Sequence, residues 1–115
     1  MAAGVYNFVC EQGATFEKVL TLRDANGDLY DFTGCTARMH VRRDHKATDV
    51  LISLTTENNR LTLGDEEGTI EFFIAADDTS AIARDGVYDL EVETAGGHVY
   101  RLLKGRFDLD PEVTR

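Results

Sequence analysis

Hydrophobic and polar side chains alternate along most of this chain, the two-residue period of β-strands that bury one face. In the clearest segment Ala37, Met39 and Val41 are apolar, and the residues between them are basic or polar. The segments that follow this pattern are residues 16–23, 36–42, 50–55, 61–63, 69–74, 88–93 and 99–109. The pattern predicts seven to nine short strands.

Turn-forming residues separate these strands. Asn26-Gly27 is a strong hairpin signal, because both residues tolerate a positive φ, and it predicts a hairpin from about Thr15 to Asp31. Gly96-Gly97 predicts a second hairpin, which leads into the last long strand. Residues 32–35 are interpreted as a turn or a switch between sheets. Loops or turns are also expected at residues 43–49, 57–59 and 64–68.

One segment breaks the alternation. Residues 77–84 combine an Asp-Asp-Thr-Ser start with Ala81, Ile82 and Ala83. Because aspartate or serine can cap a helix N-terminus, the segment predicts one short helix or helical turn. Gly86 is expected to end it.

These elements predict an all-β fold, an immunoglobulin-like antiparallel β-sandwich with one short helix, and an open barrel is the alternative. The length of 115 residues suits a single domain over residues 1–115. Residues 1–5 are uncharged, and they are either an arm that reaches a neighbouring molecule or a frayed end. Pro111 ends the last strand and leaves a polar tail at residues 111–115.

The composition limits the classes of partner that the chain is expected to bind. The net charge of −9 repels phosphate, so nucleic acids and anionic membranes are disfavoured partners. No targeting segment or membrane-spanning apolar run is visible, so synthesis in a cytosol is the simplest expectation. Cys10 and Cys35 are expected to be reduced, small apolar core residues, with a disulfide as the alternative.

The search for chemistry yields no catalytic, cofactor-binding or metal-binding residues. Asp24, Asn26 and Asp28 have the spacing that begins a calcium loop, but its twelfth position is Cys35, which cannot supply the bidentate ligand. The three histidines (His40, His45 and His98) lack ligand spacing, and no serine lies in a nucleophile motif. Carboxylate clusters at residues 65–67 and 77–78 fall in expected turns. We therefore expect a protein that is not an enzyme.

Two charged rows are more informative. Arg38, His40 and Arg42 form a basic row on one strand, and a second strand carries an acidic row of Asp89, Glu91 and Glu93. The rows either pair across strands within the molecule or dock a neighbouring molecule. In the second case the interface candidates are Arg38, Arg42, Arg43, Glu91 and Glu93.

Several stretches carry a family resemblance. They are Glu11–Phe16, Asp31–Met39, Gly68–Ile70, the Ala-Asp-Asp-Thr helix start, Gly86–Glu91 and Arg101–Gly105. From about Tyr6 to Thr114 the chain resembles small structural proteins of tailed bacteriophages, and it is similar to the N-terminal attachment domain of some baseplate upper proteins and tail-fibre anchors. Cys35 departs from the family pattern, which usually has an aromatic residue there.

The resemblance implies a non-enzymatic virion protein without catalytic residues. It implies an adaptor in a tail, a baseplate or a fibre anchor, assembled in the host bacterial cytoplasm and present in several symmetric copies that contact other virion proteins. One alternative is a capsid-decorating cement protein. Another is a carbohydrate-binding β-sandwich, although such modules usually expose aromatic platforms and this chain has no tryptophan.

Overall fold

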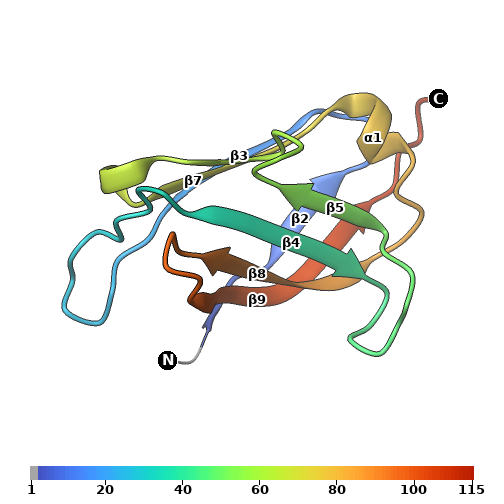
Figure 1. Ribbon diagram of the computed structural model, residues 1–115. Coiled ribbons are helices and arrows are strands. Elements are labelled where there is room, and N and C mark those ends of the chain that lie inside the picture. The colour runs from blue at the N-terminus through green and yellow to red at the C-terminus, as the bar shows by residue number, and fades with distance from the viewer. Residues whose placement is uncertain (1–2) are drawn as a thin grey trace.

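The computed structural model describes residues 3–115, which contain nine strands, one short α-helix and one 3-10 turn (Figure 1). In chain order these are β1 (Gly4–Val5), β2 (Phe8–Glu11), β3 (Phe16–Thr21), β4 (Thr36–Arg42), β5 (Ile52–Thr55), β6 (Leu61–Leu63), η1 (Asp65–Glu67), β7 (Thr69–Ile74), α1 (Ala76–Ser80), β8 (Gly86–Glu93) and β9 (Val99–Asp110).

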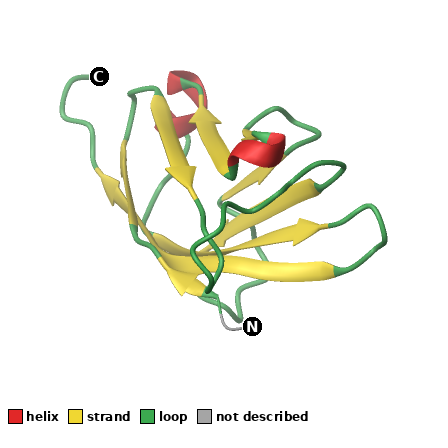
Figure 2. Ribbon diagram, turned by 90° about the vertical axis from the view of Figure 1, so that its left-hand side faces the viewer, coloured by secondary structure: helices red, strands yellow, loops and turns green. Residues whose placement is uncertain are grey.

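The strands form two sheets that face each other as layers (Figures 1 and 2). The larger sheet has the order β1-β9-β8-β4-β5, and β2 also pairs with β9; the smaller sheet has the order β3-β7-β6. An immunoglobulin-type sandwich likewise packs strands B, E and D against strands G, F and C. The all-β sandwich prediction is confirmed, and the chain does not form the alternative open barrel.

Two strand pairs depart from the antiparallel pattern. β1 and β2 run parallel to β9, with Gly4 opposite Leu103 and Phe8 opposite Phe107. The described part of the expected N-terminal arm therefore lies against this chain's own β9, and residues 1–2 lie outside the described residues. At the other terminus, the backbone N–H of Glu112 in the tail donates a hydrogen bond to Gln12 Oε1.

The core between the sheets is centred on aromatic side chains. Phe8 is 2% exposed, and its ring lies 4.8–6.2 Å from the rings of five other aromatic residues. These are Tyr6, Phe16, Phe72, Tyr88 and Phe107, from strands of both sheets and the segment before β2. The alternating apolar positions of the sequence thus meet in one cluster, which positions β4, β8 and β9 with their other face outward.

The first predicted hairpin is wrong in its pairing. The turn forms as expected, since Gly27 has a φ of 85° and the N–H of Asp24 donates to the carbonyl of Asp28. However, beyond a single bridge between Arg23 and Leu29, the following residues do not continue the ladder. β3 pairs along its length with β7 in the other half of the chain. A local turn signal fixes the turn but not the partner of the strand before it.

The helix prediction is right in place and wrong in its boundaries. α1 begins at Ala76 after Ala75, without a side-chain cap, and ends at Ser80. Gly86 begins β8 rather than ending the helix, and glycine suits this position because a Cβ would lie 2.6 Å from the carbonyl oxygen of Arg42 in the adjacent strand. Within residues 3–115, neither helical segment has the length and apolar character needed to cross a membrane.

The two cysteines have different surroundings. Neither forms a disulfide; Cys10 is buried in the core as expected, whereas Cys35 is only partly buried at its edge. Burial and the nearby Glu11 carboxylate raise the pKa of Cys10 to about 11. Cys35 lies instead in the turn after Phe32.

Candidate functional site

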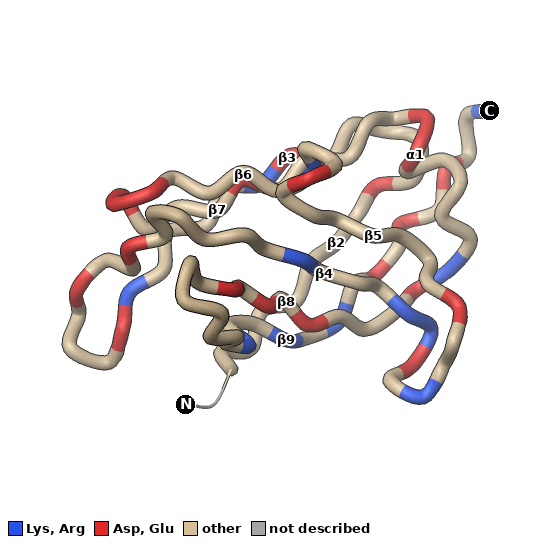
Figure 3. Tube along the Cα trace, in the orientation of Figure 1, with Lys and Arg blue, Asp and Glu red and all other residues tan. Residues whose placement is uncertain are grey.

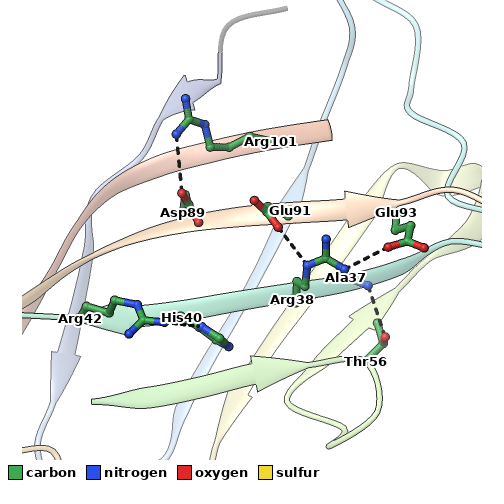
Figure 4. Close-up of polar contacts among 9 residues, drawn as sticks. All are labelled: Ala37, Arg38, His40, Arg42, Thr56, Asp89, Glu91, Glu93 and Arg101. Atoms are coloured by element: carbon green, nitrogen blue, oxygen red, sulfur yellow. Dashed lines mark hydrogen bonds and ion pairs between the residues drawn. The ribbon is translucent and has the colours of Figure 1, made fainter. Parts of the chain in front are cut away.

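Charged residues follow β4, β8 and β9 (Figure 3), and their side chains form three rows on the outer face of the larger sheet, part of which Figure 4 shows. The acidic row of β8 lies between the basic row of β4 and a second basic row on β9, which contains Arg101 and Lys104. In register, Arg38 of β4 and Arg101 of β9 flank Glu91 of β8 from opposite sides. Opposite charges directly across neighbouring strands favour this pairing over a shifted register.

A β-bulge creates the β9 row. Leu90 pairs with Leu103 but Glu91 pairs with Arg101, so Leu102 is an extra residue on β9. The extra residue allows Leu102 and Leu103 both to be buried, and it leaves Arg101 and Lys104 on the same outer face. This row was missed in the sequence, because strict alternation puts positions 101 and 104 on opposite faces. The adjacent pair of buried-type residues, Leu102-Leu103, is the signal that could have revealed the bulge.

Arg38 is paired within the molecule (Figure 4). Its Nε lies 2.9 Å from Glu91 Oε1 and its Nη1 lies 3.1 Å from Glu93 Oε1. These hydrogen bonds raise the pKa of Arg38 above its ordinary value. Three of the five interface candidates are therefore brought together, as a cross-strand cluster that joins β4 to β8.

The other two candidates lie at the end of β4. Arg42 donates from Nη1 to the carbonyl oxygens of Ala47 (3.3 Å) and Thr48 (2.7 Å), and from Nη2 to Nδ1 of His40 (3.2 Å). Arg42 thus closes the loop that follows β4. Arg43 contacts Asp44 at 3.4 Å, with both side chains more than half exposed.

The rows surround a hollow of about 630 Å³ on this face. We call it the basic hollow, and its lining is Val5, Arg38, His40, Arg42, His45, Val87, Tyr88, Asp89, Glu91, Arg101, Lys104, Gly105 and Arg106. Five of these residues are lysine or arginine and two are acidic, although the whole chain carries a net charge of −9. The basic hollow is thus a local reversal of the molecule's charge.

The basic residues of β9 are the ones that face outward. Lys104 is exposed and makes no ion pair with any described residue, and Arg101 reaches Asp89 only at 3.6 Å. Arg106 contacts Asp108 at 3.3 Å with two thirds of its side chain exposed. These three side chains are exposed and make at most one ion pair each, so they can meet an anionic surface, whereas Arg38 and Arg42 are engaged in the fold.

The described residues offer no assembled metal centre. No three histidine, cysteine or acidic side chains among residues 3–115 are grouped so that they could hold a metal ion. In the turn at residues 24–28, Asp24 Oδ1 instead accepts hydrogen bonds from the N–H groups of Asn26 (2.9 Å) and Asp28 (3.0 Å). That carboxylate therefore stabilises the hairpin turn.

No family model matches this chain, and no curated protein matches it significantly.

Proposed function

We propose that this chain is a non-enzymatic structural adaptor of a tailed-phage particle, which joins a tail, baseplate or fibre component to its neighbours through protein–protein contacts. The observation that carries the proposal is the basic hollow on the outer face of the larger sheet. It is built from three strands of one sheet, it is open to solvent, and it carries exposed cationic side chains, of which Lys104 makes no ion pair with a described residue.

The charged residues of this face fall into a structural set and an exposed set, which supports a docking role. Arg38 and Arg42 hold β8 and the loop after β4, so they fix the shape of the face. Arg101, Lys104 and Arg106 extend from that shaped face into solvent. Preorganised charges of one sign favour a complementary partner and its rapid association. The partner expected here is an acidic protein surface, because a chain of net charge −9 disfavours a nucleic acid.

The resemblance to phage structural proteins agrees with this role. Its residues occupy positions that shape the sandwich: Phe32 is 3% exposed, and Gly34 has a φ of 76° in the turn that leads into β4. Gly86 permits the close approach of β8 to β4. The shared residues thus describe a scaffold, and the charged face is what the scaffold presents.

The first test is the protein content of purified particles. We expect quantitative mass spectrometry of particles from the encoding phage to find this chain in several copies, in the number set by the symmetry of a tail or baseplate. Absence from infectious particles would overturn the proposal. A copy number in the hundreds, matching the head lattice, would favour the cement-protein alternative.

The second test concerns the basic hollow. The double variant Lys104→Glu with Arg106→Glu should be incorporated into particles at least tenfold less than the wild type. The matched control is Arg84→Glu, an exposed arginine in the segment between α1 and β8. Equal incorporation of the double variant and the wild type, with both folded by circular dichroism, would exclude the basic hollow as the docking surface.

A further inference from the structure

A second charged feature lies at the end of the molecule where β3 leads into β4. We call it the acidic end, and it consists of the loop at residues 22–35 and the turn at residues 64–68. Its carboxylates are Asp24, Asp28, Asp31, Asp65, Glu66 and Glu67, and its basic residue is Arg23. Figure 3 shows these acidic segments gathered at the end of the sandwich away from the C-terminus.

Hydrogen bonds hold the two segments together. The N–H of Phe32 donates to the carbonyl of Asp65 at 2.7 Å, and the N–H of Leu22 donates to the carbonyl of Gly68 at 2.8 Å. Gly68 has a φ of 69°, and a Cβ there would lie 2.9 Å from the carbonyl oxygen of Leu22. The acidic end is therefore a preformed surface, with Asp28, Asp31 and residues 65–67 exposed on it.

An apolar pocket adjoins the acidic carboxylates. It has a volume of about 240 Å³, and its lining is Tyr30, Asp31, Phe32, Cys35, Val92, Thr94, Tyr100 and Leu102. Tyr100 is 46% exposed beside it. Asp31 is the one acidic residue of this lining and the others are apolar or uncharged, so a small apolar depression lies directly beside the acidic end.

We propose that the acidic end of one copy docks into the basic hollow of the next copy, so that the chain assembles head to tail. The inference rests on the proposed function in one respect, because it takes the basic hollow as a docking surface. The two surfaces lie on different parts of one protomer, so the contact is heterologous, and repetition produces a closed ring or a stack.

Charge complementarity carries this choice of partner. The acidic end has six carboxylates and one arginine, and the hollow has five basic residues and two acidic ones. The acidic end of a second copy is thus a surface of complementary charge for the hollow. The carboxylates of residues 77–78 are less available, because Asp78 pairs with Arg60 at 3.0 Å.

The net charge sets the conditions for association. Two copies of net charge −9 repel each other at long range, but the Debye length of ~10 Å at 0.1 M salt screens that repulsion while leaving contact pairs effective. We therefore expect self-association to be strongest near 0.1–0.2 M salt, weaker at ~0.01 M, and largely lost at ~1 M.

The test is sedimentation velocity at protein concentrations up to several hundred micromolar in about 0.15 M salt. The wild type should form species larger than a monomer as its concentration rises. The hollow variant (Lys104→Glu with Arg106→Glu) and an end variant (Glu66→Lys with Glu67→Lys) should each weaken this association at least tenfold. An equimolar mixture of the two variants should restore association, because the reversed charges again complement each other.

Matched controls use exposed residues outside both surfaces. Arg84→Glu controls for the hollow variant and Glu57→Lys for the end variant, and both should associate like the wild type. A wild type that stays monomeric at all concentrations, or two single-surface variants that fail to recover when mixed, would overturn the inference.

Particle incorporation separates this inference from the proposed function. If the hollow variant is excluded from particles while the end variant enters normally, the hollow binds another virion protein, and the head-to-tail contact is wrong while the adaptor role stands. If the chain is absent from particles but the mixed variants recover association, the adaptor role is wrong and the head-to-tail contact stands. If the wild type bound a polyanion such as heparin and did not self-associate, the inference would be wrong and the hollow would belong to a different ligand.

Discussion

At the scale of single residues, Thr79 is the fully buried polar side chain in the described core. Its hydroxyl accepts a hydrogen bond from the N–H of Gly13 at 3.0 Å and lies 2.8 Å from the carbonyl oxygen of Ala14. One side chain of α1 thus satisfies the turn that carries the chain from β2 in one sheet to β3 in the other. These hydrogen bonds contribute to stability, because a buried donor without a partner bears its full desolvation cost.

Replacing Thr79 with valine should therefore destabilise the fold although the side-chain volume hardly changes. The part-buried N–H of Gly13 loses its acceptor, so the free energy of unfolding should fall by about 1–3 kcal/mol. Urea denaturation measures this difference. Ser80→Ala is the control, since the exposed Ser80 hydroxyl bonds only to the carbonyl of Ala76 within its own helix. Equal stability of the two variants would contradict the role of Thr79.

The Cys10 thiol makes stability depend on alkaline pH. Its pKa is about 11 in the folded chain and near the ordinary 9.0 in the unfolded chain. Between pH 9 and 11 the unfolded state has therefore released a proton that the folded state retains, so the free energy of unfolding falls as pH rises. The slope contributed by one such group is at most ~1.4 kcal/mol per pH unit.

Comparison with Cys10→Ala isolates this effect. The variant should show a shallower fall in stability from pH 9 to 11, measured by denaturant unfolding at each pH. Burial also raises the pKa of Tyr88, but that contribution is common to both proteins and cancels in the difference. Parallel pH profiles would show that the Cys10 thiol does not carry the dependence.

At the scale of elements, β9 organises the larger sheet. It pairs with β8 on one side and with both β1 and β2 on the other. Gly105 lies where β1 gives way to β2, and a Cβ there would lie 2.2 Å from the carbonyl oxygen of Tyr6. The same backbone oxygen accepts a 2.6 Å hydrogen bond from the Tyr88 hydroxyl, so it cannot move away without breaking that bond.

Gly105→Ala should accordingly destabilise the protein by about 1–3 kcal/mol and loosen the N-terminal strands. Hydrogen exchange should show faster exchange of the N–H of Tyr6, which donates to the carbonyl of Lys104. Gly4→Ala is the matched control, because its Cβ would meet nothing closer than 3.5 Å. Exchange in Gly105→Ala as slow as in this control would refute the constraint.

The elements also show which parts of the fold the sequence could predict. Strands β4 and β8 and the turn at Gly96-Gly97 were predicted well, because alternation and turn chemistry are local properties. The pairing of β3 with β7 and of β1 and β2 with β9 was not predicted, since it joins segments far apart in the chain. The bulge at Leu102 was not predicted either, because it is defined by the partner strand.

The candidate surface was likewise predicted from the sequence only in part. The rows on β4 and β8 were visible as alternating charges, but the sequence left open whether they pair internally. The register answers this for Arg38, which binds Glu91 and Glu93. The outward-facing lysine and arginines of β9 were missed, because the bulge moves Arg101 and Lys104 onto one face.

At the scale of the whole molecule, charge is separated over a body of 44 × 27 × 24 Å. Six of the 21 acidic residues lie at the acidic end and five lysine and arginine residues line the basic hollow, within a chain that is acidic overall. Clustered like charges repel, so the carboxylates of the acidic end are unfavourable for an isolated protomer. A protein that keeps such a cluster gives up some stability, and function is the usual reason for doing so.

This reasoning makes a prediction about the acidic end alone. Glu66→Gln combined with Glu67→Gln removes two like charges from an exposed turn, so the dilute protein should become more stable. We expect Tm to rise by about 2 °C at low salt, with a smaller rise at high salt, where screening already weakens the repulsion. Calorimetry at two salt concentrations measures both shifts, with Glu57→Gln as the control for an exposed glutamate outside the cluster.

The same variant should self-associate more weakly although its folded state is more stable. Neutral side chains cannot complement the basic hollow, so self-association should weaken while Tm rises. Opposite signs for these two effects are what a surface kept for contact requires. If neutralisation lowered Tm, or raised it without any loss of association, the carboxylates would belong to the fold or to the solvent, and the acidic end would not be a docking surface.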